Sequence, residues 1–479
     1  MVIIYSDIFE IKRGIRMTET MKKTENVPVT ENKMGVMPVN KLLLTMSVPM
    51  MLSMLVQALY NIVDSIFVAR ISENALTAVS LAFPIQQLMI ALGGGTCVGL
   101  NAILSRALGE KDFKKVNESA VNTVFLMVLN AIVFFLVGVF VVKPFYLAQT
   151  ADVEIIEYGI QYLRIVCMFS FGIYFQFVFE RLLQSTGNTF YTMITQLVGA
   201  LTNIILDPIL IFGLLGMPKL GVAGAAIATV IGQIAAAITA IILNHKKNHE
   251  VQLIFKGFKP SLPMIKQIYA VGIPSIIMQS IGSIMVFCMN QILIAFSTTA
   301  TAVFGVYFKL QSFIFMPIFG MNNGMVPIVA YNYGAQKRSR LLKTVKLSVM
   351  YAVGIMCVGL IIFQLIPDKL FMLFDASEHM LEMGVPALRI ISVHFPIAGV
   401  CIICGTLFQA LGNAVYSMIN SICRQIVVLL PAAYLLAQLG NVDYVWWSFP
   451  IAELMSLLMT CIFLVKINKD IISKIGDVE

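Results

Sequence analysis

Two carboxyl side chains, Asp64 and Asp207, lie within long apolar segments of the sequence. A charged group at the centre of a bilayer costs about 2.5–3.5 kcal/mol even on the more lenient insertion scales, so each one needs a reason to be there. Such carboxyl groups either carry protons or cations, or serve as polar contacts between packed helices. We favour the first role, because Ser, Thr and Asn provide interhelical contacts without burying two carboxylates.

The polar residues around these acids recur at helical spacing. Spacings of three and four residues give a first stripe on one helix face, made of Ser53, Gln57, Tyr60, Asn61 and Asp64. A second stripe consists of Gln196, Gly199, Ala200, Asn203 and Asp207, and the next segment carries Thr229 and Gln233. With a rise of about 1.5 Å per residue, Asp64, Asp207 and Thr229 are expected at one depth. The sequence therefore predicts a cation or proton site made of Asp64, Asn203, Asp207 and Thr229.

The same stripes predict the wall of a substrate cavity. Its candidate lining residues are amide and phenol side chains: Gln57, Tyr60, Asn61, Gln196, Gln233, Gln279 and Asn290. The 29 methionines and 32 phenylalanines suit an adaptable apolar cavity, although both residue types also fill helical bundles. Aromatic faces attract organic cations.

Two further acids lie in apolar segments. Glu453 is expected about two and a half turns into the last segment. It is either a second ion site or a structural acid with a basic partner, and its position alone does not separate the two. Glu180 ends its segment beside Arg181, and we expect it to be a solvated residue at the mouth of the bundle.

The residues that an enzyme would need are missing. Cys401 and Cys404 form a C-x-x-C pattern in the middle of an apolar segment, where small packing residues are the better interpretation. His245 and His249 lie in a lysine-rich hydrophilic loop. The glycine run 93–95 leads into no nucleotide-binding domain. We therefore expect no enzyme activity, no metal site, no cofactor and no ATPase subunit, so that energy would come from an ion gradient.

The composition indicates that these apolar segments are surrounded by lipid. Of the 479 residues, 59% are hydrophobic and only 12% are charged, against about 25% charged in soluble domains. A bilayer span needs about 20 apolar residues. We predict an all-α polytopic membrane protein with twelve spans, at residues 42–69, 77–104, 118–142, 156–180, 190–214, 222–243, 264–296, 302–330, 344–366, 385–410, 416–438 and 444–466.

The loops between these spans alternate in charge. One side collects 26 of the 33 Lys and Arg residues, Arg181 and Arg424 among them, and the other side has only four. By the positive-inside rule, both termini are expected in the cytoplasm, in a multi-pass protein of the cell membrane. The net charge of +8 is explained by this bias and requires no nucleic-acid partner.

The chain also repeats itself at a constant difference in residue number. This is the difference between positions 49 and 274, and we call it the repeat offset. The same step in residue number pairs Pro49 with Pro274, Gly109 with Gly334, and the run 163–165 with 388–390. Six spans per repeat put the two halves in the same orientation, as in transporters built from parallel repeats. The predicted parts are an N-terminal cytoplasmic tail (1–40), a six-helix lobe (41–245), a cytoplasmic linker (246–262), a second six-helix lobe (263–467) and a C-terminal cytoplasmic tail (468–479). The first tail is expected to be poorly ordered, without a cleavable signal peptide, and to start at Met1, Met17 or Met21.

Several runs of the sequence resemble the multidrug and toxic compound extrusion (MATE) family. They are residues 47–49, 60–68, 183–188, 203–208 and 221–229, and the similarity extends from about Lys41 to Lys469. The resemblance implies a two-lobe, twelve-helix exporter that runs on H⁺ or Na⁺. It places the family's cation site of the first lobe on Asp64, Asn203, Asp207 and Thr229.

The resemblance does not extend to a cation site in the second lobe. Some family members use acids on spans 7 and 10, where this chain has Gln279, Asn290 and His394. We expect a monomeric antiporter that exports organic cations, with protons rather than Na⁺ as the main coupling ion. The alternative is a flippase for a lipid-linked saccharide or cell-wall precursor, which would favour an Arg-lined cavity.

Overall fold

The computed structural model describes residues 31–255, 257–374 and 376–476, and these are helical and contain no strand. Ten of their helices are long and apolar enough to cross a membrane. Two further spans are pairs of shorter helices that meet at bends of 43° and 49°, which brings the count to twelve. The predicted all-α polytopic fold is confirmed.

The first half of the chain forms one six-span lobe. Its elements are α2 (Lys33–Val36), α3 (Val39–Ala69), α4 (Glu73–Gly109), α5 (Phe113–Leu136), the π-helix η1 (Val137–Val141), α6 (Val142–Gln149), α7 (Val153–Met168), α8 (Phe171–Ser185), α9 (Thr189–Phe212), the 3-10 helix η2 (Leu214–Gly216) and α10 (Val222–Lys247). The bent span is the pair α7 and α8.

The second half forms the other lobe. Its elements are α11 (Leu262–Ile294), α12 (Thr298–Gly334), α13 (Arg338–Leu365), α14 (Pro367–Met372), α15 (Glu378–Ser392), α16 (Phe395–Ala410), α17 (Ala414–Ile422), the π-helix η3 (Cys423–Leu429), α18 (Leu430–Ala437), α19 (Val442–Trp446), α20 (Ser448–Asp470) and the 3-10 helix η4 (Ile472–Lys474). Here the bent span is the pair α15 and α16.

The two lobes repeat each other down to their helix caps. Helices α4 and α12 both contain 37 residues, and their first residues, Glu73 and Thr298, are separated by the repeat offset. The Ser72 hydroxyl accepts a hydrogen bond from the Ala75 N–H at 3.0 Å, and the Ser297 hydroxyl accepts one from the Ala300 N–H at 3.0 Å. Such caps satisfy N–H groups that the first helical turn leaves without partners. The local sequence therefore starts both helices in the same way.

The interface between the lobes is reciprocal. A Cβ atom on Gly109 would collide with the backbone of Tyr331, and one on Gly334 would collide with the backbone of Arg106. The two contacts exchange places at the repeat offset. Only glycine permits such a close approach of two helix backbones. A contact that maps onto itself when the lobes are exchanged is the mark of parallel repeats about a two-fold axis, as the sequence predicts.

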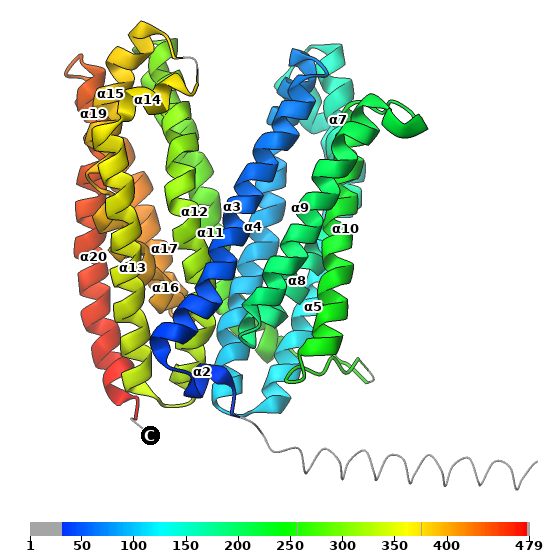
Figure 1. Cartoon of the computed structure of the whole chain (residues 1–479), viewed down its shortest axis with the longest axis vertical. Helices are drawn as coiled ribbons and strands as arrows, with labels where there is room; N and C mark the ends of the chain where they lie inside the picture. Colours follow the sequence, from blue (N-terminus) through cyan, green and yellow to red (C-terminus); the bar gives the residue numbers. More distant parts are fainter. Residues whose placement is uncertain (1–30, 256, 375, 477–479) are drawn as a thin grey trace, which may run out of the picture.

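Figure 1 shows how the lobes are arranged. Helix α11 packs on α4 and α12 packs on α3, so these four helices join the lobes. The bundles meet near α2 and the C-terminal end of the chain, and they diverge toward the opposite end. We call the end that carries α2 the α2 end and the opposite one the open end.

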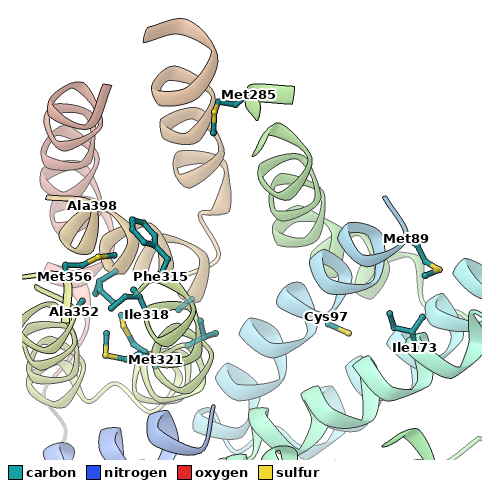
Figure 2. Close-up of a cluster of buried hydrophobic side chains, with 14 of the residues drawn as sticks. Met89, Cys97, Ile173, Met285, Phe315, Ile318, Met321, Ala352, Met356 and Ala398 are labelled. Carbon is teal, nitrogen blue, oxygen red and sulfur yellow. The ribbon is translucent and has the colours of Figure 1, made fainter. Parts of the chain in front are cut away.

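Each lobe has a core of apolar side chains. Figure 2 shows part of it: Met89, Cys97 and Ile173 in the first lobe, and Phe315, Ile318, Met321, Ala352, Met356 and Ala398 in the second. Cys97 is buried as a free thiol, and so are Cys401 and Cys404 of the C-x-x-C pattern. These cysteines lie in the core as small packing residues.

The described part of the N-terminal tail is ordered, which corrects the expectation for residues 31–40. The Asn32 amide donates hydrogen bonds to Glu250 at 2.8 Å, in the segment that joins the lobes. Glu31 forms an ion pair with Lys337 at 2.9 Å, and the Arg340 guanidinium donates to the Met37 carbonyl at 2.7 Å. The Lys337 ammonium holds the pKa of the Glu31 carboxyl below its ordinary value. Residues 31–37 thus connect the two lobes, because their polar groups find partners on both. The predictions for residues 1–30 lie outside the described residues.

Two basic residues assigned to loops lie inside helices. Arg181 belongs to α8, which ends only at Ser185, and Arg424 belongs to the π-helix η3 in the middle of its span. Without these two residues, 24 basic residues remain on the side that carries both termini. The charge bias persists, and the predicted orientation stays a prediction, as do the limits of the five predicted parts.

Candidate functional site

Three helices bring together the residues that the sequence predicts as an ion site. Asp64 comes from α3, Asn203 and Asp207 come from α9, and Thr229 comes from α10. Helix α9 packs against both α3 and α10. The Asn203 Nδ2 atom lies 3.3 Å from Asp207 Oδ1 and 3.4 Å from Thr229 Oγ1. With the amide turned over, its N–H donates to Asp207 Oδ2 at 3.2 Å and its oxygen accepts from the Thr229 N–H at 3.3 Å. In either orientation Asn203 links Asp207 to Thr229.

The two carboxyl groups of this cluster face each other. Asp64 and Asp207 lie close enough for one to donate a hydrogen bond to the other once either is protonated. Asp207 is completely buried. Asp64 Oδ1 is also buried and has no hydrogen-bond partner among the described residues. Two adjacent carboxylates repel each other, and more so when partly buried, so a proton or a bound cation stabilises the pair.

The residue after Asp207 interrupts the helical hydrogen bonds of α9. Pro208 lies inside α9 and has no N–H group. It therefore cannot donate the helical hydrogen bond to the carbonyl of Ile204, one turn earlier.

The ion-site residues border a cavity of about 490 Å³ inside the first lobe. Its wall is formed by α3, α4 and α7 to α10, with Asn323 of α12 as a contribution from the second lobe. Asp64, Asn203 and Thr229 line it directly, and Asp207 lies behind them. The predicted wall residues that line this cavity are Gln57, Tyr60, Asn61, Gln196 and Gln233.

Two predicted wall residues lie elsewhere. Gln279 and Asn290 are on α11 and do not line this cavity. The Gln279 amide donates to the Ser275 carbonyl of its own helix at 3.4 Å. Their role in substrate contact stays a prediction.

Glu180 and Arg181 are cavity residues that the sequence interpretation missed. Glu180 was expected to be solvated, but it lines the cavity and is only 3% exposed. Its Oε1 accepts from Thr195 at 2.8 Å and from Gln176 at 3.0 Å, and its Oε2 accepts from Gln196 at 3.0 Å. The helical spacing of Gln176, Glu180 and Gln184 is the signal that could have revealed a polar face here.

Glu453 has a basic partner. It is 2% exposed, and its Oε2 forms an ion pair with Arg424 Nη1 at 3.1 Å. Its Oε1 has no hydrogen-bond partner among the described residues. The pairing agrees with the structural alternative, and a second ion site at Glu453 stays a prediction. Residues 31–255, 257–374 and 376–476 hold no group of three or more His, Cys, Asp or Glu that could bind a metal ion.

Comparison with known proteins decides the family. The MatE family model matches residues 49–209 and matches again at residues 274–435. The chain belongs to the MatE family. It is therefore a multi-pass membrane transporter and not an enzyme. The starting points of the two matches, 49 and 274, are separated by the repeat offset.

Individual relatives of this MatE transporter cover most of its length. The multidrug export protein MepA of Staphylococcus aureus (strain bovine RF122 / ET3-1) is 28% identical over 422 residues, 87% of this chain and 91% of MepA. An outward-facing multidrug resistance MATE family transporter of the MOP superfamily superposes with a TM-score of 0.86 at 25% identity, covering 93% of this chain and 100% of the other. A Pyrococcus furiosus transporter of the same superfamily, described by a binding pocket of reverse polarity, also superposes with a TM-score of 0.86 at 25% identity. The superposition covers 93% of this chain and 100% of the other.

Proposed function

We propose that this MatE transporter is an ion-coupled antiporter that exports organic cations. The observation that carries the proposal is the facing pair Asp64 and Asp207 at the border of a cavity large enough for a drug-sized molecule. Binding of one monovalent ion removes one negative charge from the pair, and its release restores that charge next to the substrate space. The coupling ion and a cationic substrate are then both attracted by the negative charge of the same site.

The relatives support export as the direction of transport and drugs as the cargo. MepA is named a multidrug export protein, and the outward-facing relative is named a multidrug resistance transporter. Both lobes of this chain align with them, so the same architecture is available for alternating access. The lobes would rock about the reciprocal glycine interface, as parallel-repeat transporters do.

Protons are the coupling ion that we propose. Desolvation favours the neutral form of a carboxyl group, so a buried pair takes up a proton without further ligands. Sodium needs a closed shell of oxygens. Asp64, Asp207 and Thr229 with the Asn203 amide provide part of such a shell, which keeps Na⁺ as the second candidate.

Orientation and assembly complete the proposal. The excess of basic residues near α2 and the C-terminal end would put the α2 end in the cytoplasm of the cell, with the transporter in its plasma membrane. The open end would then face outward. We propose a monomer that works without an ATPase subunit or a cofactor, since a single chain supplies both lobes and the cavity.

The flippase alternative predicts a cavity lined by arginines. Arg181 lines the cavity, together with the acids Asp64 and Glu180. Because acids outnumber bases on this wall, the cavity suits a cation better than a lipid-linked phosphate.

Efflux from proteoliposomes tests the proposal. Purified transporter should export organic cations under an imposed pH gradient without sodium. Transport that appears only with a Na⁺ gradient would replace the proton by Na⁺. Failure to move any cation under either gradient, with transport of a lipid-linked saccharide instead, would establish the flippase.

A further inference from the structure

Glu180 differs from Glu453, the other buried glutamate among the described residues. Glu453 has an arginine partner, whereas Glu180 forms no ion pair with any described residue. Its neighbour Arg181 donates to Gln184 at 2.9 Å and to Asn323 at 3.1 Å, and it attracts the Glu180 carboxylate without forming an ion pair with it. All the hydrogen bonds to the carboxylate come from neutral groups. Hydrogen bonds from neutral donors orient a carboxylate but do not cancel its charge.

Gln196, which contacts Glu180, supplies an acceptor that lacks a donor. The Gln196 amide directs its N–H toward Glu180, so its Oε1 points elsewhere and is buried without a partner. Gln196 also lines the cavity. An unsatisfied buried carbonyl is destabilising, so a ligand that donates an N–H group to it binds more tightly than one that cannot.

Glu180 is also separated from the ion site. Gln196, which contacts Glu180, lies two helical turns before Asn203 on α9. Two turns correspond to about 10 Å along the helix. The cavity therefore has two acidic centres, Asp64 with Asp207 toward the open end and Glu180 toward the α2 end.

We propose that Glu180 is the substrate anchor of this cavity and that it takes cations carrying N–H donors, such as primary ammonium, amidinium and guanidinium groups. The carboxylate pairs with the positive charge, and the free carbonyl of Gln196 accepts a further N–H group. A quaternary ammonium ion has the charge but no N–H to donate. The inference rests on the proposed function, because it takes the cavity as the substrate space.

Equilibrium binding to the purified, intact transporter tests the anchor without any gradient. The probes are an aryl amidinium and the aryl trimethylammonium of matching size. Wild type should bind the amidinium more tightly. Glu180→Gln should raise the amidinium Kd by about 10- to 100-fold, the range of a lost charge-assisted hydrogen bond. The trimethylammonium Kd should rise by about threefold or less, because a diffuse cation loses only a screened attraction.

Matched variants separate the anchor from general effects. Glu157→Gln removes a glutamate charge at an exposed position and should leave both Kd values unchanged. Gln196→Leu removes the free carbonyl beside Glu180 and should weaken amidinium binding more than trimethylammonium binding. Glu180→Asp keeps the charge and should restore part of the binding if Glu180→Gln is poorly folded.

The outcomes are distinct from those of the proposed function. Unchanged amidinium binding in folded Glu180→Gln, or equal losses for both probes, would overturn the anchor. Binding that follows the prediction while no gradient drives export would refute the antiporter and leave the anchor standing.

Discussion

The two lobes share one scaffold and differ in how they use buried charge. At the repeat offset, Asp64 of the first lobe corresponds to Met289 of the second, and residues 414–437, which match the span of Asp207, contain no Asp or Glu. The second lobe has its own ion pair, in which the buried Glu453 contacts the half-buried Arg424 at 3.1 Å. In the first lobe the acids face a cavity, and in the second the acid faces an arginine.

This difference separates the requirements of the fold from those of transport. The glycines that let the lobes touch, Gly109 and Gly334, are present in both halves because both halves must make the same contact. The carboxyl pair is present in one half only, and in the function we propose one ion site is enough to couple a gradient to movement of the lobes. The repeat therefore gives the architecture, and departures from the repeat mark the chemistry.

The largest effect is expected on transport, from changes to the two aspartates of the first lobe. Asp64→Asn and Asp207→Asn should each reduce gradient-driven efflux to background, since an amide cannot take up the ion. Neither change should lower the melting temperature in detergent, because removing one of two facing carboxyl groups relieves repulsion. Efflux from proteoliposomes measures the effect, with the exposed Glu157→Gln as control. Full transport by both variants would remove the site.

Stability should respond most strongly in the second lobe. Glu453→Gln removes the partner of Arg424 and should cost about 3 kcal/mol of unfolding free energy, the low end of the range for a buried pair, because the Arg424 side chain keeps 28% of its surface exposed. A combined Arg424→Met and Glu453→Leu change should recover most of this loss, since apolar replacements of a buried ion pair are often tolerated. Denaturation in mild detergent measures both. A double variant as unstable as the single one would show that the pair does more than compensate charge.

The shared interface should respond symmetrically. Gly109→Ala and Gly334→Ala should each destabilise the protein by about 1–3 kcal/mol, the usual cost of overpacking. The two losses should be similar, because the contacts are reciprocal. Gly354→Ala, on a helix with open space around it, is the matched control and should be neutral or slightly stabilising. A loss at only one of the two interface glycines would contradict the two-fold arrangement.

The smallest effect is expected from a supporting ligand. Thr229→Val keeps the shape of the side chain and removes the hydroxyl near Asn203. Losing one such hydrogen bond costs about 0.5–1.5 kcal/mol, so the apparent affinity for the coupling ion should fall by roughly 2- to 13-fold. The dependence of efflux on ion concentration measures it. A complete loss of transport would assign Thr229 a larger role than that of a supporting ligand.

The sequence predicted the features that follow from periodicity. Apolar segments gave the spans, the constant offset gave the repeat, and helical spacing brought Asp64, Asn203, Asp207 and Thr229 together. The spacing worked because α9 keeps regular geometry between Gln196 and Asp207.

The features that the sequence missed depend on helix ends and on distant partners. The bend between α7 and α8 lets the span continue to Ser185, so Glu180 lies inside it instead of at its mouth. Arg424 looks like a loop residue because its partner Glu453 is on another span. Hydropathy cannot identify a buried charge whose partner is remote in sequence.

Proton release on substrate binding tests most directly the claim that the coupling ion binds at the pair in the first lobe. An organic cation is added to purified transporter in weakly buffered detergent solution, and the change in pH is recorded. Because coupling is reciprocal, cation binding should expel protons from the wild type. Asp64→Asn and Asp207→Asn should bind the cation without releasing protons, while folded Glu453→Gln should release them as the wild type does. Undiminished release from both aspartate variants, or its loss in Glu453→Gln alone, would contradict the account.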